Sequence, residues 1–124
     1  MTVQGVVLNL MAARYCANSS GAQEPYEYTN IQNFERLVVH VRMLYSSDAI
    51  TGSEIAFSSG NYKRSDCMTP LYSYTPPAEQ IGNVYDFVLG RDGETATELG
   101  AWLKLTWVAG VSDVWVAEVK AVGR

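Results

Sequence analysis

The alternation of apolar and polar side chains in the last third of the chain constrains its fold more than any other sequence feature. Leu103, Leu105 and Trp107 fall on one side of an extended chain, and a second alternating run covers residues 114–121. Side chains two positions apart in a strand point to the same face of a sheet. The pattern therefore predicts two strands. Because the link at residues 110–113 is short and contains glycine, we expect these strands to form an antiparallel hairpin.

A third alternating run lies in the middle of the chain. The side chains expected to face a core there are those of Leu37, Val39, Val41 and Met43. A helix competes with this interpretation, because Ile31, Phe34 and Val38 are spaced three or four apart and a sequence like a capping box runs from Thr29 to Gln32. The clustered β-branched valines are stiff at χ1 and favour a pleated chain. We therefore predict a strand.

Weaker patterns of the same kind occur elsewhere. An alternating run at residues 84–89 stops before the Asp-Gly pair at residues 92–93, which is typical of a turn. Shorter candidate strands are residues 6–10, 26–28, 54–57 and 71–74. The rest of the stretch from residue 58 to residue 82 is rich in turn-forming residues, and we expect it to be mostly loop.

Seven to eight short strands separated by turn signals, without an alternation of strand and helix, indicate two packed antiparallel sheets. We therefore predict an all-β fold, an antiparallel and jelly-roll-like β-sandwich. With 124 residues, the chain is expected to form a single domain over residues 1–124. Residues 1–25 are expected to provide an N-terminal arm together with the first strand.

The charge balance excludes one class of partner. The net charge is −4, with 9 basic and 13 acidic residues, and the basic residues are scattered along the chain. Proteins that bind nucleic acid by electrostatic attraction instead cluster Lys and Arg to neutralise phosphates. No apolar stretch approaches the roughly 18 residues of a membrane span. We expect neither a nucleic-acid partner nor a membrane partner.

The residues that usually perform catalysis are sparse. The chain contains one histidine, His40, and two cysteines, Cys16 and Cys67. His40 falls on the face opposite the apolar side chains of its strand, where a surface or interface position is expected. No nucleophile motif surrounds either cysteine, and the two could form a disulfide or remain separate buried thiols. We predict no catalytic residue and no enzyme activity.

Cofactor and metal sites are not predicted either. The glycines form neither of the phosphate-binding loop motifs, so no nucleotide cofactor is expected. Cys and His are too far apart for a zinc motif. Asp92, Glu94 and Glu98 lie in one turn region and could offer oxygen ligands to Ca²⁺, but they do not follow the pattern of a calcium-binding loop. We interpret them as a solvated turn.

Tyrosine is the most suggestive residue type, because it supplies a large amphipathic contact area at low entropic cost. The candidate interface residues are Tyr26, Tyr28, Tyr62, Tyr72 and Tyr74. Three interpretations remain open for them. They could contact other subunits, stack against a glycan with the help of loop carboxylates such as Asp66 and Glu79, or cap the ends of the sandwich.

Four segments carry a resemblance to a known group of proteins. They are FERLVVHV at residues 34–41, SSGNY at 58–62, LGAWLKLTWVAG at 99–110 and VWVAEV at 114–119. Together they resemble the small β-sandwich virion proteins of tailed bacteriophages, in the succession of a central strand, a loop and a final hairpin with a Gly-containing turn. The likeness covers the chain from residue 34 onward.

The resemblance implies a structural role in the virion. The expected function is that of a capsid decoration or cement protein, or a related head or tail component, which stabilises the phage head by burying surface against the major capsid protein or other virion subunits. It also implies a closed homo-oligomer, most simply a trimer, because such packing covers edge strands. The alternative is a carbohydrate- or receptor-binding β-sandwich module.

Overall fold

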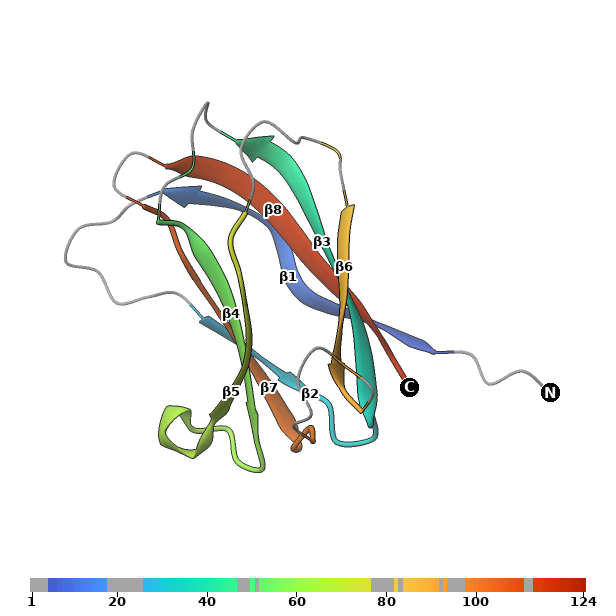
Figure 1. Ribbon diagram of the computed structural model, residues 1–124. Coiled ribbons are helices and arrows are strands. Elements are labelled where there is room, and N and C mark those ends of the chain that lie inside the picture. Colours follow the sequence, from blue (N-terminus) through green and yellow to red (C-terminus); the bar gives the residue numbers. More distant parts are fainter. Residues whose placement is uncertain are drawn as a thin grey trace.

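The computed structural model describes residues 5–17, 26–46, 50, 52–76, 82, 84–91, 93, 98–110 and 113–124. These residues form eight strands and one short 3-10 helix, Ser65–Cys67. The strands are β1 (Val6–Ala17), β2 (Tyr26–Asn30), β3 (Arg36–Ser46), β4 (Glu54–Gly60), β5 (Thr69–Tyr74), β6 (Val84–Gly90), β7 (Trp102–Val108) and β8 (Val114–Gly123) (Figure 1). No helix in the described part of the chain is long and apolar enough to cross a membrane.

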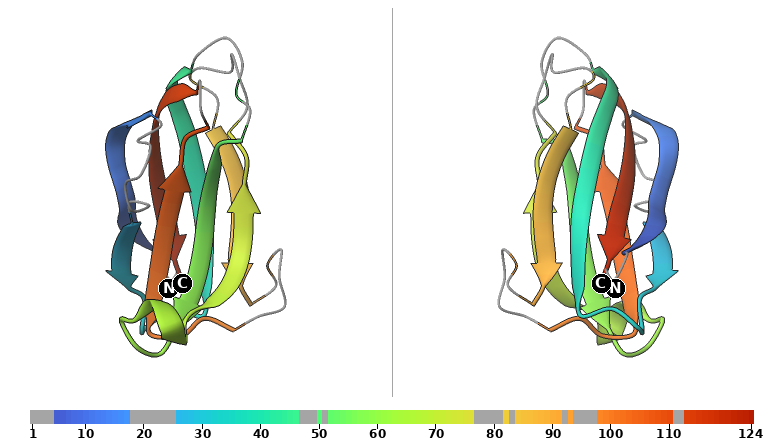
Figure 2. Two further views of the ribbon diagram at one scale, coloured as in Figure 1. Left: turned by 90° about the vertical axis from the view of Figure 1, so that its left-hand side faces the viewer. Right: turned by 90° about the vertical axis from the view of Figure 1, so that its right-hand side faces the viewer.

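The strands form two four-stranded sheets with the orders β1-β8-β3-β6 and β2-β7-β4-β5. Every paired neighbour is antiparallel. The first strand pairs with the eighth, the second with the seventh, the third with the sixth and the fourth with the fifth. A long antiparallel hairpin that is folded over into two layers produces this order, and the result is a jelly roll. The two panels of Figure 2 look onto the two sheets from opposite sides, and the predicted all-β sandwich is confirmed.

The core lies between the sheets and is filled by alternate residues of each strand. In β3 the side chains of Leu37, Val39, Val41 and Met43 are fully buried. Their burial confirms the strand prediction, and the competing helix for this segment is wrong. In β7 and β8 the same alternation buries Leu103, Leu105, Trp107, Trp115, Ala117, Val119 and Ala121. Removing this apolar surface from water is the main stabilising contribution to a fold without helical layers.

The predicted hairpin between residues 102–107 and 114–121 is wrong, because β7 and β8 belong to different sheets. After Val108 the chain crosses to the facing sheet. Packed sheets lie about 10 Å apart, and extended chain spans about 3.3 Å per residue, so a few residues are enough for the crossing. A short link is therefore equally compatible with a hairpin and with a passage between layers.

The strand β1 departs from the simple alternation that the sequence suggests. In β1 the register shifts between Asn9 and Met11, so that Leu10 and Met11 are both buried although they are adjacent. Val6, which alternation would place inside, is about half exposed. In the region expected to be mostly loop, β4 extends to Gly60 and β5 begins at Thr69. A register shift like the one in β1 is a β-bulge, and the alternation of side chains does not continue through a bulge.

Candidate binding surfaces

The outward face of the sheet β2-β7-β4-β5 carries two of the tyrosines that the sequence singles out, Tyr26 and Tyr28. Strand pairing places Tyr26 of β2 beside Thr106 of β7, and Tyr28 beside Lys104. Lys104 and Thr106 alternate with the buried side chains of β7, so they point away from the core. Residues that are paired directly across two strands share a face of the sheet, so Tyr26 and Tyr28 point the same way. The left panel of Figure 2 faces this sheet and shows β2 and β7 side by side, with the 3-10 segment below them.

We call the cluster at this place the aromatic-lysine surface and define it as Tyr26, Tyr28, Lys63, Ser65, Trp102 and Lys104. The Lys63 ammonium lies 5.2 Å from the centre of the Trp102 ring and 5.8 Å from that of Tyr28. The Lys104 ammonium lies 5.2 Å from the centre of the Tyr26 ring and 5.9 Å from that of Tyr28. Each lysine is therefore within cation-π range of two rings.

Ser65 connects the loop after β4 to this sheet. The Lys104 ammonium donates a hydrogen bond of 2.7 Å to the Ser65 hydroxyl, and the hydroxyl groups of Tyr28 and Ser65 share one of 3.1 Å. Tyr26 and Tyr28 also contact each other edge to face, with ring centres 5.4 Å apart. These contacts restrict the rotamers of both rings and of Lys104, so the polar and aromatic groups are held in place without a ligand.

The positive charge of the surface is not neutralised within it. The nearby carboxylate of Asp66 is held by Arg64, whose guanidinium donates hydrogen bonds of 2.7 and 3.1 Å to its two oxygens. Among the described residues, neither Lys63 nor Lys104 forms an ion pair. Two ammonium groups thus remain available to an anion, although the net charge of the chain is −4.

A shallow groove of about 590 Å³ adjoins the aromatic-lysine surface and shares Ser65 and Lys104 with it. It runs over the outward face of β7, β4 and β5. The other residues that line it include Glu54, Ala56, Ser58, Met68, Pro70, Ser73 and Thr106. Its size lies within the roughly 300–1,000 Å³ that is typical of small-ligand sites.

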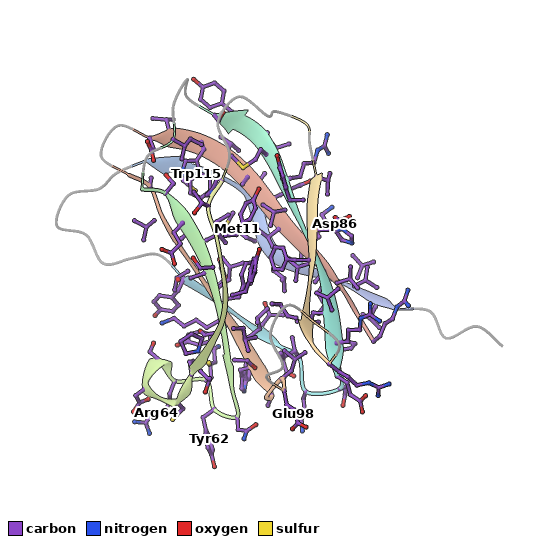
Figure 3. All side chains as sticks on the ribbon, viewed as in Figure 1. Met11, Tyr62, Arg64, Asp86, Glu98 and Trp115 are labelled. Carbon is purple, nitrogen blue, oxygen red and sulfur yellow. The ribbon has the colours of Figure 1, made fainter. Side chains whose placement is uncertain are left out.

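The five tyrosines predicted as interface candidates separate into two groups. Tyr26 is 47% exposed, and both Tyr26 and Tyr28 belong to the aromatic-lysine surface. Tyr62 is 66% exposed and points away from the molecule at the end of the sandwich (Figure 3). Tyr72 and Tyr74 lie on β5, at the opposite edge of the same sheet, so the structure does not bring all five together, although Tyr72 also lines the groove.

Tyr72 and Tyr74 pack against the core. Their ring centres lie 4.4 and 6.3 Å from that of Phe87, which is buried in β6. The Tyr74 hydroxyl is buried and has no hydrogen-bond partner in the described structure. Burial raises the pKa of Tyr74 well above its ordinary value of 10.0, and the neighbouring Tyr85 and Tyr72 raise the pKa further. These two side chains cap one side of the sandwich.

The outward face of the other sheet carries His40. Its Nδ1 atom lies 2.6 Å from Oδ1 of Asp86 on the adjacent strand β6, and the two side chains are 37% and 61% exposed. This placement agrees with the surface position expected for His40. Of the two cysteine side chains, Cys16 is buried and Cys67 is exposed, and both are thiols. The expectation of two buried thiols therefore holds only for Cys16.

A row of four valines crosses the same outward face. Strand pairing aligns Val122 of β8 with Val7 of β1 and with Val38 of β3, and aligns Val38 in turn with Val88 of β6. Val7 is 70% exposed, and the other three are half-buried. We call this set the valine row. One row further along the strands lie Asn9, Lys120, His40 and Asp86, so a polar belt borders the apolar one.

Of the three carboxylates in the turn region that we interpreted as a solvated turn, the structure describes only Glu98. Asp92 and Glu94 lie outside the described residues, as does Glu79. Glu98 lies at the end of the sandwich (Figure 3). Within the described ranges, no group of three His, Cys, Asp or Glu side chains could hold a metal ion.

Comparisons with protein-family models, with curated proteins and with solved structures find no match for this chain. The resemblance to phage virion proteins therefore remains a prediction from the sequence. Sequence reasoning also missed most of the aromatic-lysine surface, namely Lys63, Ser65, Trp102 and Lys104. The only available signal was the alternation in β7, which already placed Trp102 and Lys104 opposite the buried leucines.

Proposed function

We propose that this chain is a non-enzymatic structural virion protein, a decoration or cement protein that stabilises a phage head by subunit contacts. The observation that carries the proposal is the valine row. An antiparallel sheet that faces water normally presents polar side chains on that side, whereas here an apolar row runs across all four strands of one sheet. Contiguous exposed apolar patches mark surfaces that another molecule covers.

The remaining support is physical. Complete burial of an exposed valine contributes about 1.5 kcal/mol or more; Val7 can contribute most of this gain, and the three half-buried valines of the row contribute smaller parts of it. The polar belt beside it, with Lys120 and Asp86, supplies charges of both signs, which fix the orientation of a partner more than they add affinity. The jelly-roll fold occurs in viral capsid domains and in lectins. Because one fold hosts many functions, the fold alone does not choose between them.

The partner in this proposal is the major capsid protein, and the protein itself assembles as a trimer. Purified protein, mixed with empty shells of the major capsid protein from the same genome, should co-sediment with a saturating stoichiometry set by the shell lattice. Light scattering of the free protein should give the mass of three chains. Saturation that does not follow the lattice, or no binding at all, would overturn the proposal.

A matched pair of variants locates the contact. Val38→Lys places a charge in the middle of the valine row, and we expect it to weaken shell binding at least about tenfold. Thr106→Lys makes a similar change at an outward position of a central strand in the opposite sheet, and it should leave shell binding unchanged. Equal binding by both variants would show that the valine row is not the contact.

A second function, carbohydrate binding, is favoured by a different observation. The aromatic-lysine surface combines aromatic rings with hydroxyl and ammonium donors beside a groove of about 590 Å³. Sugar rings stack their apolar faces on aromatic side chains while their hydroxyls form hydrogen bonds. Binding to a glycan array that is lost in Tyr28→Ala would support this function, and a blank array would contradict it. A decoration protein can carry both surfaces, because they lie on opposite sheets.

A further inference from the structure

The geometry points to an acidic saccharide as the ligand of the aromatic-lysine surface: a sugar that stacks on the exposed aromatic rings and places its carboxylate or sulfate between Lys63 and Lys104. This inference rests on the second proposed function, carbohydrate binding, and specifies the class of sugar. Its basis is the arrangement of two cations around one aromatic ring.

The first step concerns charge. Both ammonium groups lie within 6 Å of the centre of the Tyr28 ring, at 5.8 and 5.9 Å. Two like charges beside one ring repel each other, and a carboxylate close to both would offset this repulsion. The loop does supply Asp66, but Arg64 holds both of its oxygens. The surface is therefore built with a local excess of positive charge on an acidic protein.

The second step concerns the position of the cations. Lys104 is half-buried and its ammonium is held by the Ser65 hydroxyl at 2.7 Å. A lysine that is fixed in this way loses less side-chain entropy when an anion binds than a freely rotating one. Lys63 is exposed, and its ammonium lies over the rings of Tyr28 and Trp102. Exposed cation-π contacts are weak, so Lys63 can turn toward an incoming anion.

The third step distinguishes a saccharide from a nucleic acid, the other ligand that combines rings with negative charge. Single-stranded nucleic acid needs a basic groove that follows a backbone of several phosphates. Here the adjoining groove is lined by Lys104 but also by the acidic Glu54, and the chain has a net charge of −4. Two local cations suit one or two anionic groups on a short sugar. The further phosphates of a nucleic-acid strand would extend past the two lysines and be repelled by the acidic protein.

The test uses saccharides in matched pairs. An array would carry sugars ending in galacturonate, glucuronate or sialic acid, each beside its neutral methyl ester, together with sulfated sugars and their unsulfated parents. We expect the protein to bind at least one acidic sugar about three- to fivefold more tightly than its neutral partner, the range expected for exposed ion pairs. The preference should shrink at high salt, because exposed charges are screened.

Variants connect the preference to the lysines. Lys104→Met and Lys63→Met keep most of the side-chain length and remove the charge, and each should reduce the preference toward equal binding. Lys120→Met removes a lysine from the opposite sheet and should leave the preference unchanged. Circular dichroism and thermal unfolding of each variant would separate a loss of binding from a loss of fold.

Each outcome decides a different point. Equal binding of acid and ester by the unmodified protein overturns the inference but leaves carbohydrate binding intact. Binding to no sugar overturns carbohydrate binding as well, while the decoration proposal stands on its separate test with Val38→Lys. Tighter binding of a short oligothymidine than of any sugar would replace the inference with nucleic-acid binding.

Discussion

A single hydroxyl, that of Ser53, organises the passage of the chain from β7 to β8. Ser53 is buried, and its Oγ donates a hydrogen bond of 2.6 Å to the buried Asp113 carboxylate. The same oxygen accepts hydrogen bonds from the Trp115 indole at 3.0 Å and from the Gly110 backbone amide at 3.1 Å. The three contacts satisfy buried and half-buried polar groups at the end of the sandwich.

Ser53→Ala removes only one hydroxyl group, but we expect it to lower the free energy of unfolding strongly, because that hydroxyl makes three hydrogen bonds. The variant leaves the buried indole of Trp115 without this acceptor, and an unsatisfied buried group costs about 1–3 kcal/mol. It also removes the acceptor of the half-buried Gly110 amide. Urea unfolding would measure the loss. Ser58→Ala, at an outward position of β4, is the control and should change the free energy of unfolding by less than about 0.5 kcal/mol. Equal stability of the two variants would show that the Ser53 hydrogen bonds do not matter.

Tyr74 predicts how stability depends on alkaline pH. In the unfolded chain its phenol ionises near the ordinary pKa of 10.0, whereas in the folded protein burial, Tyr85 and Tyr72 raise the pKa. Above pH 10 the unfolded state loses a proton that the folded state keeps, so the free energy of unfolding falls as pH rises. Well below pH 10 the phenol is protonated in both the folded and the unfolded state, so Tyr74 adds no pH dependence to the free energy of unfolding there.

Tyr74→Phe removes this ionisation, and it also removes a buried hydroxyl without a hydrogen-bond partner in the described structure. We expect the variant to be at least as stable as the unmodified protein at pH 7, and to lose less stability between pH 9 and pH 11. Tyr62→Phe, at a side chain 66% exposed, should behave like the unmodified protein. Parallel stability curves for all three proteins would contradict the prediction.

At the scale of single residues, alternation predicted the direction of side chains well where a strand keeps its register. It placed the buried residues of β7 correctly, and those of β3, which lie before the register shift between Met43 and Tyr45. It could not separate Tyr26 and Tyr28 from Tyr72 and Tyr74, because both pairs show the same spacing of two. The pairing of β4 with β5 shifts register between Phe57 and Ser58, and no sequence signal identifies which face of β5 meets the core.

At the scale of elements, the sequence predicted which segments are strands but not all of their partners. Each strand of a sandwich must bury one side, and that requirement is visible in the sequence as alternation. Pairing depends on which strands lie in the same layer, and β7 and β8 bury their alternate residues equally well from opposite layers. The sequence also did not predict the aromatic-lysine surface, because Lys63 and Ser65 are distant from β7 in the sequence and contact it only in the folded chain.

The layer assignment can be checked by nuclear magnetic resonance. In antiparallel pairs, backbone protons of directly opposed residues are close enough to give strong cross-peaks. We expect such cross-peaks between Val39 and Ala121, which are paired across β3 and β8, and between Tyr28 and Lys104 across β2 and β7. No backbone cross-peaks should connect β7 with β8. A continuous ladder of them would restore the hairpin and contradict the jelly roll.

At the scale of the whole molecule, the jelly roll separates two surfaces of different chemistry. The valine row lies on the outward face of β1-β8-β3-β6, and the aromatic-lysine surface lies on that of β2-β7-β4-β5; Figure 2 views these faces from opposite directions. The core between them keeps the outward residues of the two sheets apart. Substitutions on one face should therefore act independently of substitutions on the other.

Co-sedimentation of three proteins with phage shells, side by side, most directly tests the proposal that the domain attaches to the shell through the valine row and not through the aromatic-lysine surface. The unmodified protein and Lys104→Met should bind to the same saturating level, whereas Val38→Lys should bind at least about tenfold more weakly, a difference of about 1.4 kcal/mol in binding free energy. Binding that is lost in Lys104→Met and retained in Val38→Lys, or no saturable binding by the unmodified protein, would contradict the account.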